Sequence, residues 1–272
     1  MPLTLSFIGG GNMARSLIGG LIARGTDPNT IIVADPVQAQ RDSLQAQYRV
    51  NVTGDNTLAA KDSQTIVLAV KPQDMRAVTT GIADIMSRDC LIVSVAAGIK
   101  ASDIQRWSAG RRVVRCMPNR PALQGCGMTA LYATQDVDAS SRERAEQLLS
   151  AVGTTLWVTE EAHMDVVTAV SGSGPAYFFL LIEMLEQAAV NLGLTREVSR
   201  RLAIETAYGS GLMAREASES PATLREQVTS KGGTTEAALK HLEAQNVRAI
   251  FADAVAAAAR RSSELAQQFG TP

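Results

Sequence analysis

The chain has 272 residues, of which 46% are hydrophobic and 4% aromatic, and its 26 basic and 27 acidic side chains give a net charge of −1. This length allows one large domain or two ordinary ones, and the apolar content is sufficient for a packed core. The charges are interspersed without a basic stripe, which argues against a nucleic-acid or anionic-membrane partner.

Cysteine and histidine usage argues against a disulfide framework and against a metal site. The number of cysteines is odd and no Cys-x-x-Cys motif occurs, so a reducing compartment is the simpler interpretation. The two histidines lie far apart in the chain and lack the spacing of metal ligands, so we expect no metal. These residues are Cys90, Cys116, Cys126, His163 and His241.

No targeting or membrane segment is predicted. The N-terminus lacks the basic region of a signal peptide. The most apolar helical run, Ala176–Val190, is interrupted by Glu183 and Glu186, and we expect it to be too short and too charged to cross a bilayer. The sequence therefore predicts a soluble cytoplasmic protein.

The first elements predict a dinucleotide-binding turn. An apolar strand over Leu3–Ile8 runs into the pattern Gly-x-Gly-x-x-Ala, and helical sequence follows. Gly9 permits the tight turn, Gly11 lets a pyrophosphate approach the backbone, and Ala14 lets the helix pack closely on the strand. The N-terminus of that helix would face the phosphates. The alternative is a plain tight turn in another α/β unit.

Strand and helix patterns alternate through residues 1–159, which predicts a mainly parallel sheet with helices on both faces. Strands are expected at Leu3–Ile8, Ile31–Ala34, Thr65–Val70, Leu91–Val95, Arg112–Met117, Met128–Ala133 and Thr154–Val158. Helices are expected at Met13–Arg24, Val37–Tyr48, Met75–Met86 and Ser141–Ala151. In sheets of this kind, ligands bind beyond the carboxyl ends of the strands.

Three segments at strand ends, together with Asp35, are candidates for contact with a cofactor. Small residues in Ala69–Pro72, Ala96–Gly98 and Arg115–Asn119 would let a flat ring lie against the backbone, although each could be a simple turn. Asp35 ends the second strand, where a carboxylate can accept from the 2′-hydroxyl of the adenine ribose and so favour NADH over NADPH. Alternatively, Asp35 caps the helix that follows Pro36.

From residue 160 to residue 272 helical spacing replaces the strand pattern, which predicts a second, all-α domain. The helix over Pro175–Leu192 is apolar around nearly its whole circumference from Tyr177 to Leu185. We expect this helix to be buried against another chain rather than in the core of one chain. The helices are expected at His163–Val170, Pro175–Leu192, Arg196–Glu216, Ala222–Val228, Thr234–Leu242 and Val247–Leu265.

A glycine-rich loop over Val228–Glu236 opens one of these helices. Its N–H groups and the helix dipole would form an anion pocket, and a substrate carboxylate is the expected occupant because the first motif already accounts for the phosphates. Ser230, Thr234 and Thr235 add hydroxyls, although an ordinary helix start capped by either threonine is the alternative. No nucleophile–base pair is recognisable, which fits hydride transfer from a nicotinamide cofactor.

Together these segments resemble the pyrroline-5-carboxylate reductase family over nearly the whole chain. The most specific segment is Val228–Leu239, followed by Ser171–Tyr177. The pattern is completed, in order, by Phe7–Met13, Ala69–Pro72, Ser94–Gly98 and Cys116–Asn119.

The resemblance implies a Rossmann-type domain over residues 1–159, followed by a helical substrate-binding and dimerisation domain over residues 160–272. It implies reduction of 1-pyrroline-5-carboxylate to L-proline by NADPH or NADH, the last step of proline biosynthesis. The partner would be a second copy of the chain in an intertwined dimer, with a decamer as a larger assembly.

By position, the resemblance assigns the substrate to the loop before the helix at Thr234, with Thr235 hydrogen-bonded to the ring nitrogen as the catalytic residue. The substrate-binding residues are Val228, Ser230, Gly232, Gly233, Thr234 and Thr235. Asn56 is assigned to the adenosine end of the cofactor, and Ala69, Lys71, Ala97 and Asn119 to its nicotinamide half. With the motifs above, the cofactor-binding residues are Gly9, Gly11, Asn12, Met13, Asp35, Asn56, Ala69, Val70, Lys71, Pro72, Ala96, Ala97 and Asn119.

One residue departs from the family pattern, since Lys231 stands where the family usually has proline. It either loosens the loop or adds a cation near the substrate carboxylate. Two alternative functions make different demands on the sequence. A β-hydroxyacid dehydrogenase would need a lysine a few residues into the helix after Gly174, and Ala176–Leu181 contains none. A dinucleotide-binding scaffold without catalysis would need a damaged substrate loop, for which Lys231 is the only sign.

Overall fold

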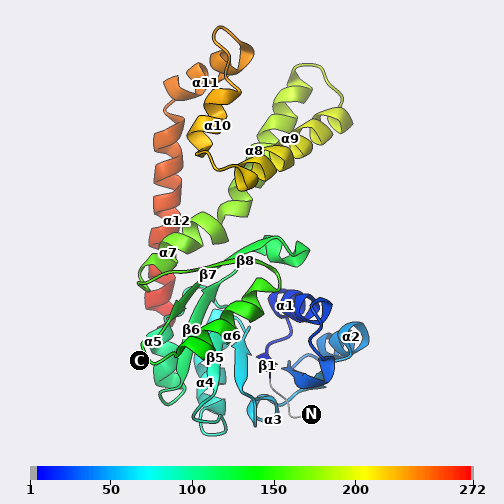
Figure 1. The fold of residues 1–272 in the computed structure, drawn as a ribbon, viewed down its shortest axis with the longest axis vertical. Helices are drawn as coiled ribbons and strands as arrows, with labels where there is room; N and C mark the ends of the chain where they lie inside the picture. Colours follow the sequence, from blue (N-terminus) through cyan, green and yellow to red (C-terminus); the bar gives the residue numbers. More distant parts are fainter. Residues whose placement is uncertain (1–4, 271–272) are drawn as a thin grey trace. The chain divides into compact units, whose positions relative to one another are not determined.

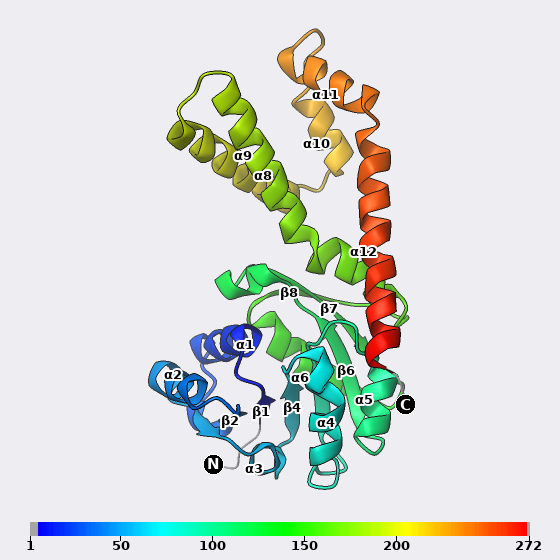
Figure 2. The ribbon, with the colours of Figure 1, turned by 180° about the vertical axis from the view of Figure 1, so that it is seen from behind.

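The computed structural model describes residues 5–270, which divide into two compact units (Figures 1 and 2). The first, here called the sheet unit, comprises Met1–Ser173 together with Ala258–Pro272. The second, the helical unit, comprises Gly174–Ala257. By packing, residues 160–173 and 258–270 belong to the sheet unit, whereas the prediction from sequence places both segments in the helical domain.

The sheet unit is built on one eight-stranded sheet in the order β3-β2-β1-β4-β5-β6-β7-β8. All neighbouring strands are parallel except β6 and β7, which confirms the prediction of a mainly parallel sheet. The strands are β1 Leu5–Ile8, β2 Ile31–Ala34, β3 Asn51–Thr53, β4 Thr65–Leu68, β5 Leu91–Ser94, β6 Arg112–Met117, β7 Gly127–Ala133 and β8 Gly153–Trp157. The chain order reverses between β1 and β4, where doubly wound sheets bind their ligands.

Helices cover both faces of the sheet, so the central strands are apolar at consecutive positions. On β2, for example, Ile31 and Val33 join one core cluster while Ile32 and Ala34 join the other. The first face is covered by α1 Asn12–Ala23, α2 Gln38–Tyr48 and α6 Ala139–Ser150. The second is covered by α3 Asn56–Ala60, α4 Pro72–Ile82 and α5 Ala101–Trp107. Short 3-10 turns lie at Pro28–Thr30 and Arg120–Gln124.

Three elements of this unit were not predicted from the sequence. Strand β3 and helices α3 and α5 have three, five and seven residues. Elements this short complete no more than two helical turns or one and a half pleats, so they leave no periodic apolar signal. Strand β4 also ends at Leu68 rather than at the predicted Val70, and the predicted positions Leu3 and Thr4 lie outside the described residues.

After β8 the chain forms α7 His163–Val167 and a π-helical turn over Thr168–Gly172. The C-terminal part of α12 Val247–Phe269 packs beside this segment within the sheet unit, where the Ser262 hydroxyl donates to Asp165 Oδ1 at 2.7 Å. The remaining helices are α8 Gly174–Asn191, α9 Arg196–Glu216, α10 Pro221–Gln227 and α11 Thr234–Ala244.

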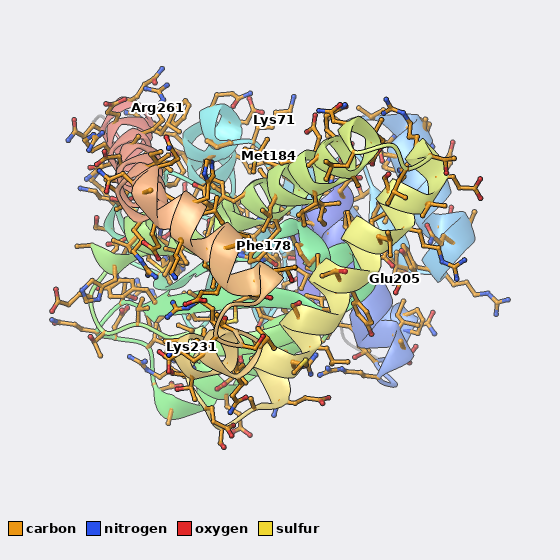
Figure 3. All side chains as sticks on the ribbon, turned by 90° about the horizontal axis from the view of Figure 1, so that it is seen from above. Lys71, Phe178, Met184, Glu205, Lys231 and Arg261 are labelled. Carbon is orange, nitrogen blue, oxygen red and sulfur yellow. The ribbon has the colours of Figure 1, made fainter. Side chains whose placement is uncertain are left out.

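In the helical unit, α8 and α9 pack as a hairpin and leave a large apolar surface exposed. Phe178 and Phe179 are 66% and 61% exposed in the single chain, and Tyr177 packs edge-on against Phe251. Figure 3 marks Phe178 and Met184 on α8. Exposed apolar side chains also lie on α9, so this surface extends over two helices and needs a covering partner. The exposed members from both helices are Phe178, Phe179, Leu180, Leu181, Met184, Leu185, Val198, Leu202, Ile204, Tyr208, Leu212 and Met213.

The helical segment His163–Asn191 spans 29 residues and is long and apolar enough to cross a membrane, which corrects the expectation that this run is too short. It is the only such helix within residues 5–270. Length and composition alone are weak evidence for a membrane span, because a helix covered by a second subunit has the same composition.

We predict that Phe179→Asp and Ile182→Asp convert the assembly into monomers or unfold the chain. Covering this surface with a partner would bury an unpaired carboxylate, which costs several kcal/mol. Analytical ultracentrifugation at micromolar concentration measures the mass. Leu58→Asp on the surface of α3 is the matched control, since Leu58 is 55% exposed and lies in the sheet unit. A stable wild-type monomer would contradict the prediction.

Candidate functional site

The turn after β1 is shaped by a close approach between two strand ends. Gly9 has φ +101°, and a Cβ on it would lie 2.7 Å from the carbonyl oxygen of Ala69 at the end of β4. Its N–H also donates to the Ala34 carbonyl at 2.8 Å. Only glycine fits this conformation and this space, so the first glycine of the motif is fixed by the sheet itself.

The N-terminus of α1 offers free hydrogen-bond donors beside this turn. Gly11 is the N-cap and provides no side-chain acceptor, and nothing lies within 4 Å of the position where its Cβ would be. The N–H groups of Asn12, Met13 and Ala14 bond to no acceptor among residues 5–270. Unpaired donors at the positive end of a helix form a site for an anion such as a pyrophosphate.

Asp35 lies directly after β2 and braces the glycine turn. Its Oδ2 accepts from the Gly10 N–H at 2.8 Å, and its Oδ1 accepts from the Val37 N–H at 2.9 Å. The N-cap of α2 is Val37, so Asp35 makes a turn over Pro36 rather than capping the helix. A carboxylate has about four lone-pair sites, so acceptor capacity remains for a ligand hydroxyl.

The other predicted cofactor residues lie at the same edge of the sheet. The register pairs Ile8 with Ala34 and with Leu68, and Leu68 with Ser94, so the chain leaves these parallel strands at one level. The segments that follow contain Asn56 after β3, Ala69, Val70, Lys71 and Pro72 after β4, Ala96 and Ala97 after β5, and Asn119 after β6. Lys71 is exposed at the N-cap of α4 (Figure 3).

The side-chain amide of Asn119 is hydrogen-bonded at both its nitrogen and its oxygen within the sheet unit. Its Nδ2 donates to the Ser171 carbonyl at 3.2 Å, and its Oδ1 accepts from the Met128 N–H at 2.9 Å. Its side chain therefore joins the turn after β6 to β7 and to the π-helical turn. This geometry supports a role for Asn119 in positioning the backbone around the site.

Two contacts that the sequence did not reveal support the loop after β5. Gly98 has φ +71°, and a Cβ on it would lie 3.1 Å from Cβ of Leu265 in α12. Glu161 Oε1 accepts from Arg115 Nη1 at 3.0 Å and from the Ala101 N–H at 2.5 Å. Leu265 and Glu161 are distant in the chain from this loop, so no pattern of neighbouring residues predicts these contacts.

The loop before α11 lies in the helical unit. Gly232 has φ +74°, and Gly233 is the N-cap with no side-chain hydrogen bond, so Thr234 and Thr235 lie inside the first turn and neither caps the helix. The N–H groups of Thr234, Thr235 and Glu236 bond to no acceptor among residues 5–270. These donors could bind a carboxylate. Lys231 is exposed on the same loop (Figure 3).

The chain itself supplies one anion to this loop. Glu236 Oε2 accepts from the Gly232 N–H at 2.6 Å, and Glu236 Oε1 pairs with Lys240 at 3.0 Å. The Gly232 N–H and then Lys240 hold the pKa of the Glu236 carboxyl below its ordinary value of 4.5. Glu236 thus fixes the turn through its side chain alone, like one half of a capping box, while leaving the donors of the first turn free.

The described residues contain no group of three acidic, cysteine or histidine side chains arranged to hold a metal ion. Burial raises the pKa of the Cys90 thiol to about 12 and also raises that of Cys116, so neither is a ready nucleophile at neutral pH.

The doubly wound sheet with a glycine turn at its switch point defines the class, a dinucleotide-binding oxidoreductase of the Rossmann type. Residues 4–98 match the family described as NADP oxidoreductase coenzyme F420-dependent, and residues 161–265 match the pyrroline-5-carboxylate reductase dimerisation family.

Similarity to known proteins extends over the full length. The chain is 48% identical to a pyrroline-5-carboxylate reductase of Pseudomonas aeruginosa over 98% of each chain, and 38% identical to that of Arabidopsis thaliana over 97% and 95%. Its structure superposes on a pyrroline-5-carboxylate reductase of Coxiella burnetii with a TM-score of 0.93 and 42% identity, covering 97% and 99% of the two chains. The chain belongs to the pyrroline-5-carboxylate reductase family.

A structure of the Plasmodium falciparum enzyme, described with NADP bound, superposes with a TM-score of 0.85 at 27% identity, covering 97% and 98%. The family assignment confirms the resemblance inferred from the sequence motifs. The roles of individual residues remain predictions.

We predict that Glu236→Gln lowers the melting temperature near neutral pH by weakening the turn before α11. Because the folded-state pKa is depressed, the stabilising effect is present above the ordinary value of 4.5 and is lost as pH falls through the lower folded value. The difference between wild type and variant should therefore shrink below pH 4.5 in thermal unfolding followed by circular dichroism. Glu226→Gln is the control; a difference independent of pH would contradict the prediction.

Proposed function

We propose that this protein reduces 1-pyrroline-5-carboxylate to L-proline with NADPH or NADH, as the last step of proline biosynthesis. The observation that carries the proposal is the full-length match to pyrroline-5-carboxylate reductases, including 48% identity to one of them. It is supported by the two sets of free N–H donors, one at the N-terminus of α1 and one at that of α11.

In this proposal, residues 1–159 bind the cofactor, and residues 160–272 bind the substrate and form the dimer. The donors at Asn12 and Met13 would hold the pyrophosphate, with Gly11 leaving room for its approach. Asp35 and Asn56 would meet the adenosine end. The nicotinamide half would lie along Ala69–Pro72 and Ala96–Ala97, in the loops supported by Asn119 and Gly98.

On the substrate side, the N–H groups of the first turn of α11 would hold the carboxylate of the imine, supported by the Ser230 hydroxyl and the backbone of Val228 to Gly233. The Thr235 hydroxyl would hydrogen-bond the ring nitrogen. When bound, the reduced nicotinamide supplies the hydride that C5 accepts. The C5–N double bond becomes a single bond, and the nitrogen ends protonated, either by entering as the iminium or by taking a proton from solvent.

The protein is a homo-oligomer, in keeping with the dimerisation family that residues 161–265 match. We propose that the apolar surface of α8 and α9 is covered by a second copy in an intertwined dimer, that dimers assemble further into a decamer, and that the enzyme works in the cytoplasm without a membrane partner. The exposed apolar area on these helices supports the dimer.

A direct assay tests the function. Purified protein should oxidise NADPH or NADH only when 1-pyrroline-5-carboxylate is present, with L-proline formed in equal amount. Oxidation of a β-hydroxyacid with reduction of the cofactor would instead support the dehydrogenase alternative. Cofactor binding without turnover of the imine would support a non-catalytic scaffold.

We predict appreciable use of NADH, and a shift toward NADPH in Asp35→Ser. Removing the carboxylate removes repulsion of the 2′-phosphate, and we expect about a tenfold change in the ratio of kcat/KM values, equivalent to about 1.4 kcal/mol. Asp35→Asn removes the negative charge but keeps the size of the side chain, and its amide oxygen can still accept from one backbone N–H. It therefore tests the charge apart from the shape. A wild type that already prefers NADPH more than about a hundredfold would leave Asp35 with its bracing role alone.

We predict that Thr235→Ala lowers kcat about 10²-fold, the low end of general acid or positioning effects, because a threonine hydroxyl is a weak acid. The KM for the cofactor should change little, and Thr235→Ser should retain most activity because it keeps the hydroxyl. Steady-state kinetics with the imine as the varied substrate measures both. If Thr235→Ala keeps the turnover and the imine affinity of the wild type, Thr235 has no catalytic role.

A further inference from the structure

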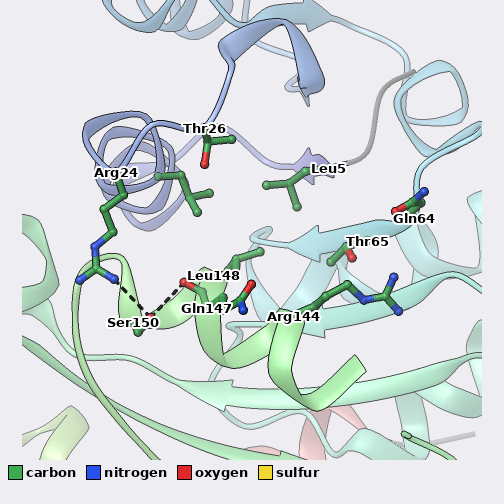
Figure 4. A pocket seen from close by; sticks show the side chains of 10 residues that line it. Leu5, Arg24, Thr26, Gln64, Thr65, Arg144, Gln147, Leu148 and Ser150 are labelled. Atoms are coloured by element: carbon green, nitrogen blue, oxygen red, sulfur yellow. Dashed lines mark hydrogen bonds between the residues drawn. The ribbon is translucent and has the colours of Figure 1, made fainter. Parts of the chain in front are cut away.

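A cavity of about 570 Å³ lies at the edge of the sheet opposite the glycine turn (Figure 4). It is lined by the last turn of α1, by α6, and by the first residues of β1 and β4. Its position separates it from the candidate cofactor residues by the length of α1, about 18 Å for twelve residues. None of the cofactor or substrate residues named above lines it.

The cavity has a fixed wall on one side. A Cβ on Gly20 would lie 2.5 Å from the carbonyl oxygen of Ala151, so α1 and the end of α6 touch there through backbone. One turn further along α1, Arg24 Nη1 donates to the Ser150 hydroxyl at 3.3 Å. Beyond this contact the two helices leave room for a ligand, and Leu21 and Leu148 form an apolar floor together with Leu5.

The charge of this cavity is unbalanced. Its lining includes two arginines, Arg24 and Arg144, and no acidic residue. Neither arginine forms an ion pair with another residue in the range 5–270. In Figure 4, the two side chains lie at opposite ends of the cavity, with Leu148 between them.

Arg144 is partly buried and has unpaired donors, one of which, Nε, is fully buried. Its Nη2 donates to the Ser141 hydroxyl at 2.9 Å, whereas its Nε is buried without any hydrogen-bond partner. A buried donor left unpaired costs about 1–3 kcal/mol, more when the group is charged. Arg144 also borders a neighbouring cavity that is lined by three carboxylates. Two of them, Asp89 and Asp138, are paired with Arg112, and the third, Asp62, forms no ion pair with Arg144.

We propose that this cavity is a second small-molecule site, which binds an aliphatic molecule with an anionic group at each end, such as a dicarboxylate. One guanidinium at each end would bind one anionic group, and the leucine floor between them would cover the aliphatic chain. Guanidinium groups pair with carboxylates through parallel hydrogen bonds, and the volume lies within the range of small-molecule pockets. Gln64 and Gln147 add polar donors and acceptors at the rim.

Isothermal titration calorimetry of the purified oligomer with adipate tests the site. Hexanoate, which has one carboxylate on an aliphatic chain, and inorganic phosphate, which is a single anionic group without a chain, are the comparison probes. We expect one adipate per chain, bound at least tenfold more tightly than either other probe. Arg24→Gln and Arg144→Gln should each weaken adipate binding at least tenfold. Arg88→Gln, on an exposed turn of the same unit, is the matched control and should leave binding unchanged.

Because Arg144→Gln could disturb α6, a second kind of variant keeps both arginines. Gln147→Trp places a large side chain at the exposed rim and should abolish adipate binding, while thermal unfolding and cofactor KM remain those of wild type. Four results would overturn the proposal: no saturable binding of adipate, equal binding of hexanoate or phosphate, equal affinity in all variants, or displacement of adipate by NADPH or NADH. The last would assign the binding to the cofactor site.

Discussion

The close approach of Gly9 to the end of β4 is the constraint that shapes the edge of the sheet where the predicted cofactor residues lie. The space between the two strand ends has no room for a Cβ, and the backbone there is left-handed. Because β1 and β4 are neighbours at the point where the sheet reverses its order, this contact sets the level at which the chain turns away from β1. The free N–H groups of α1 follow directly from that turn, and Asp35 holds it from the β2 side through the Gly10 N–H.

The loop before α11, like the turn before α1, presents unpaired N–H groups at a helix N-terminus, but a different carboxylate stabilises it. Both loops have glycine as the N-cap. At α1 the neighbouring carboxylate comes from the next strand, whereas at α11 it comes from Glu236 within the same helix. The Glu236 side chain holds the N–H of Gly232, the residue directly after Lys231.

The helical unit has few buried side chains of its own, and its apolar residues cover two adjoining helices. An exposed apolar surface of this extent marks an interaction site, and the match of residues 161–265 to a dimerisation family supports a homo-oligomer. The 29-residue helical segment looks like a membrane span for the same reason. Composition alone cannot distinguish a helix that faces lipid from one that faces a second copy of itself.

The sequence by itself determined the elements whose signal is local. The glycine turn at Gly9–Gly11, the apolar runs of the long strands and the long helices α8, α9 and α12 were predictable because periodicity and turn chemistry are read from neighbouring residues. The six family motifs, with Thr235 among them, were recognisable for the same reason.

The tertiary structure decided what depends on residues distant in the chain. It showed that the carboxylate of Asp35 braces Gly10, that the amide of Asn119 is occupied by Ser171 and Met128, and that α12 returns to pack Leu265 against Gly98. It also supplied β3, α3 and α5, which are too short to show a period, and the cavity between Arg24 and Arg144. Apart from these short elements, each feature arises from packing between residues that are distant in the chain, and no pattern of neighbouring residues indicates it.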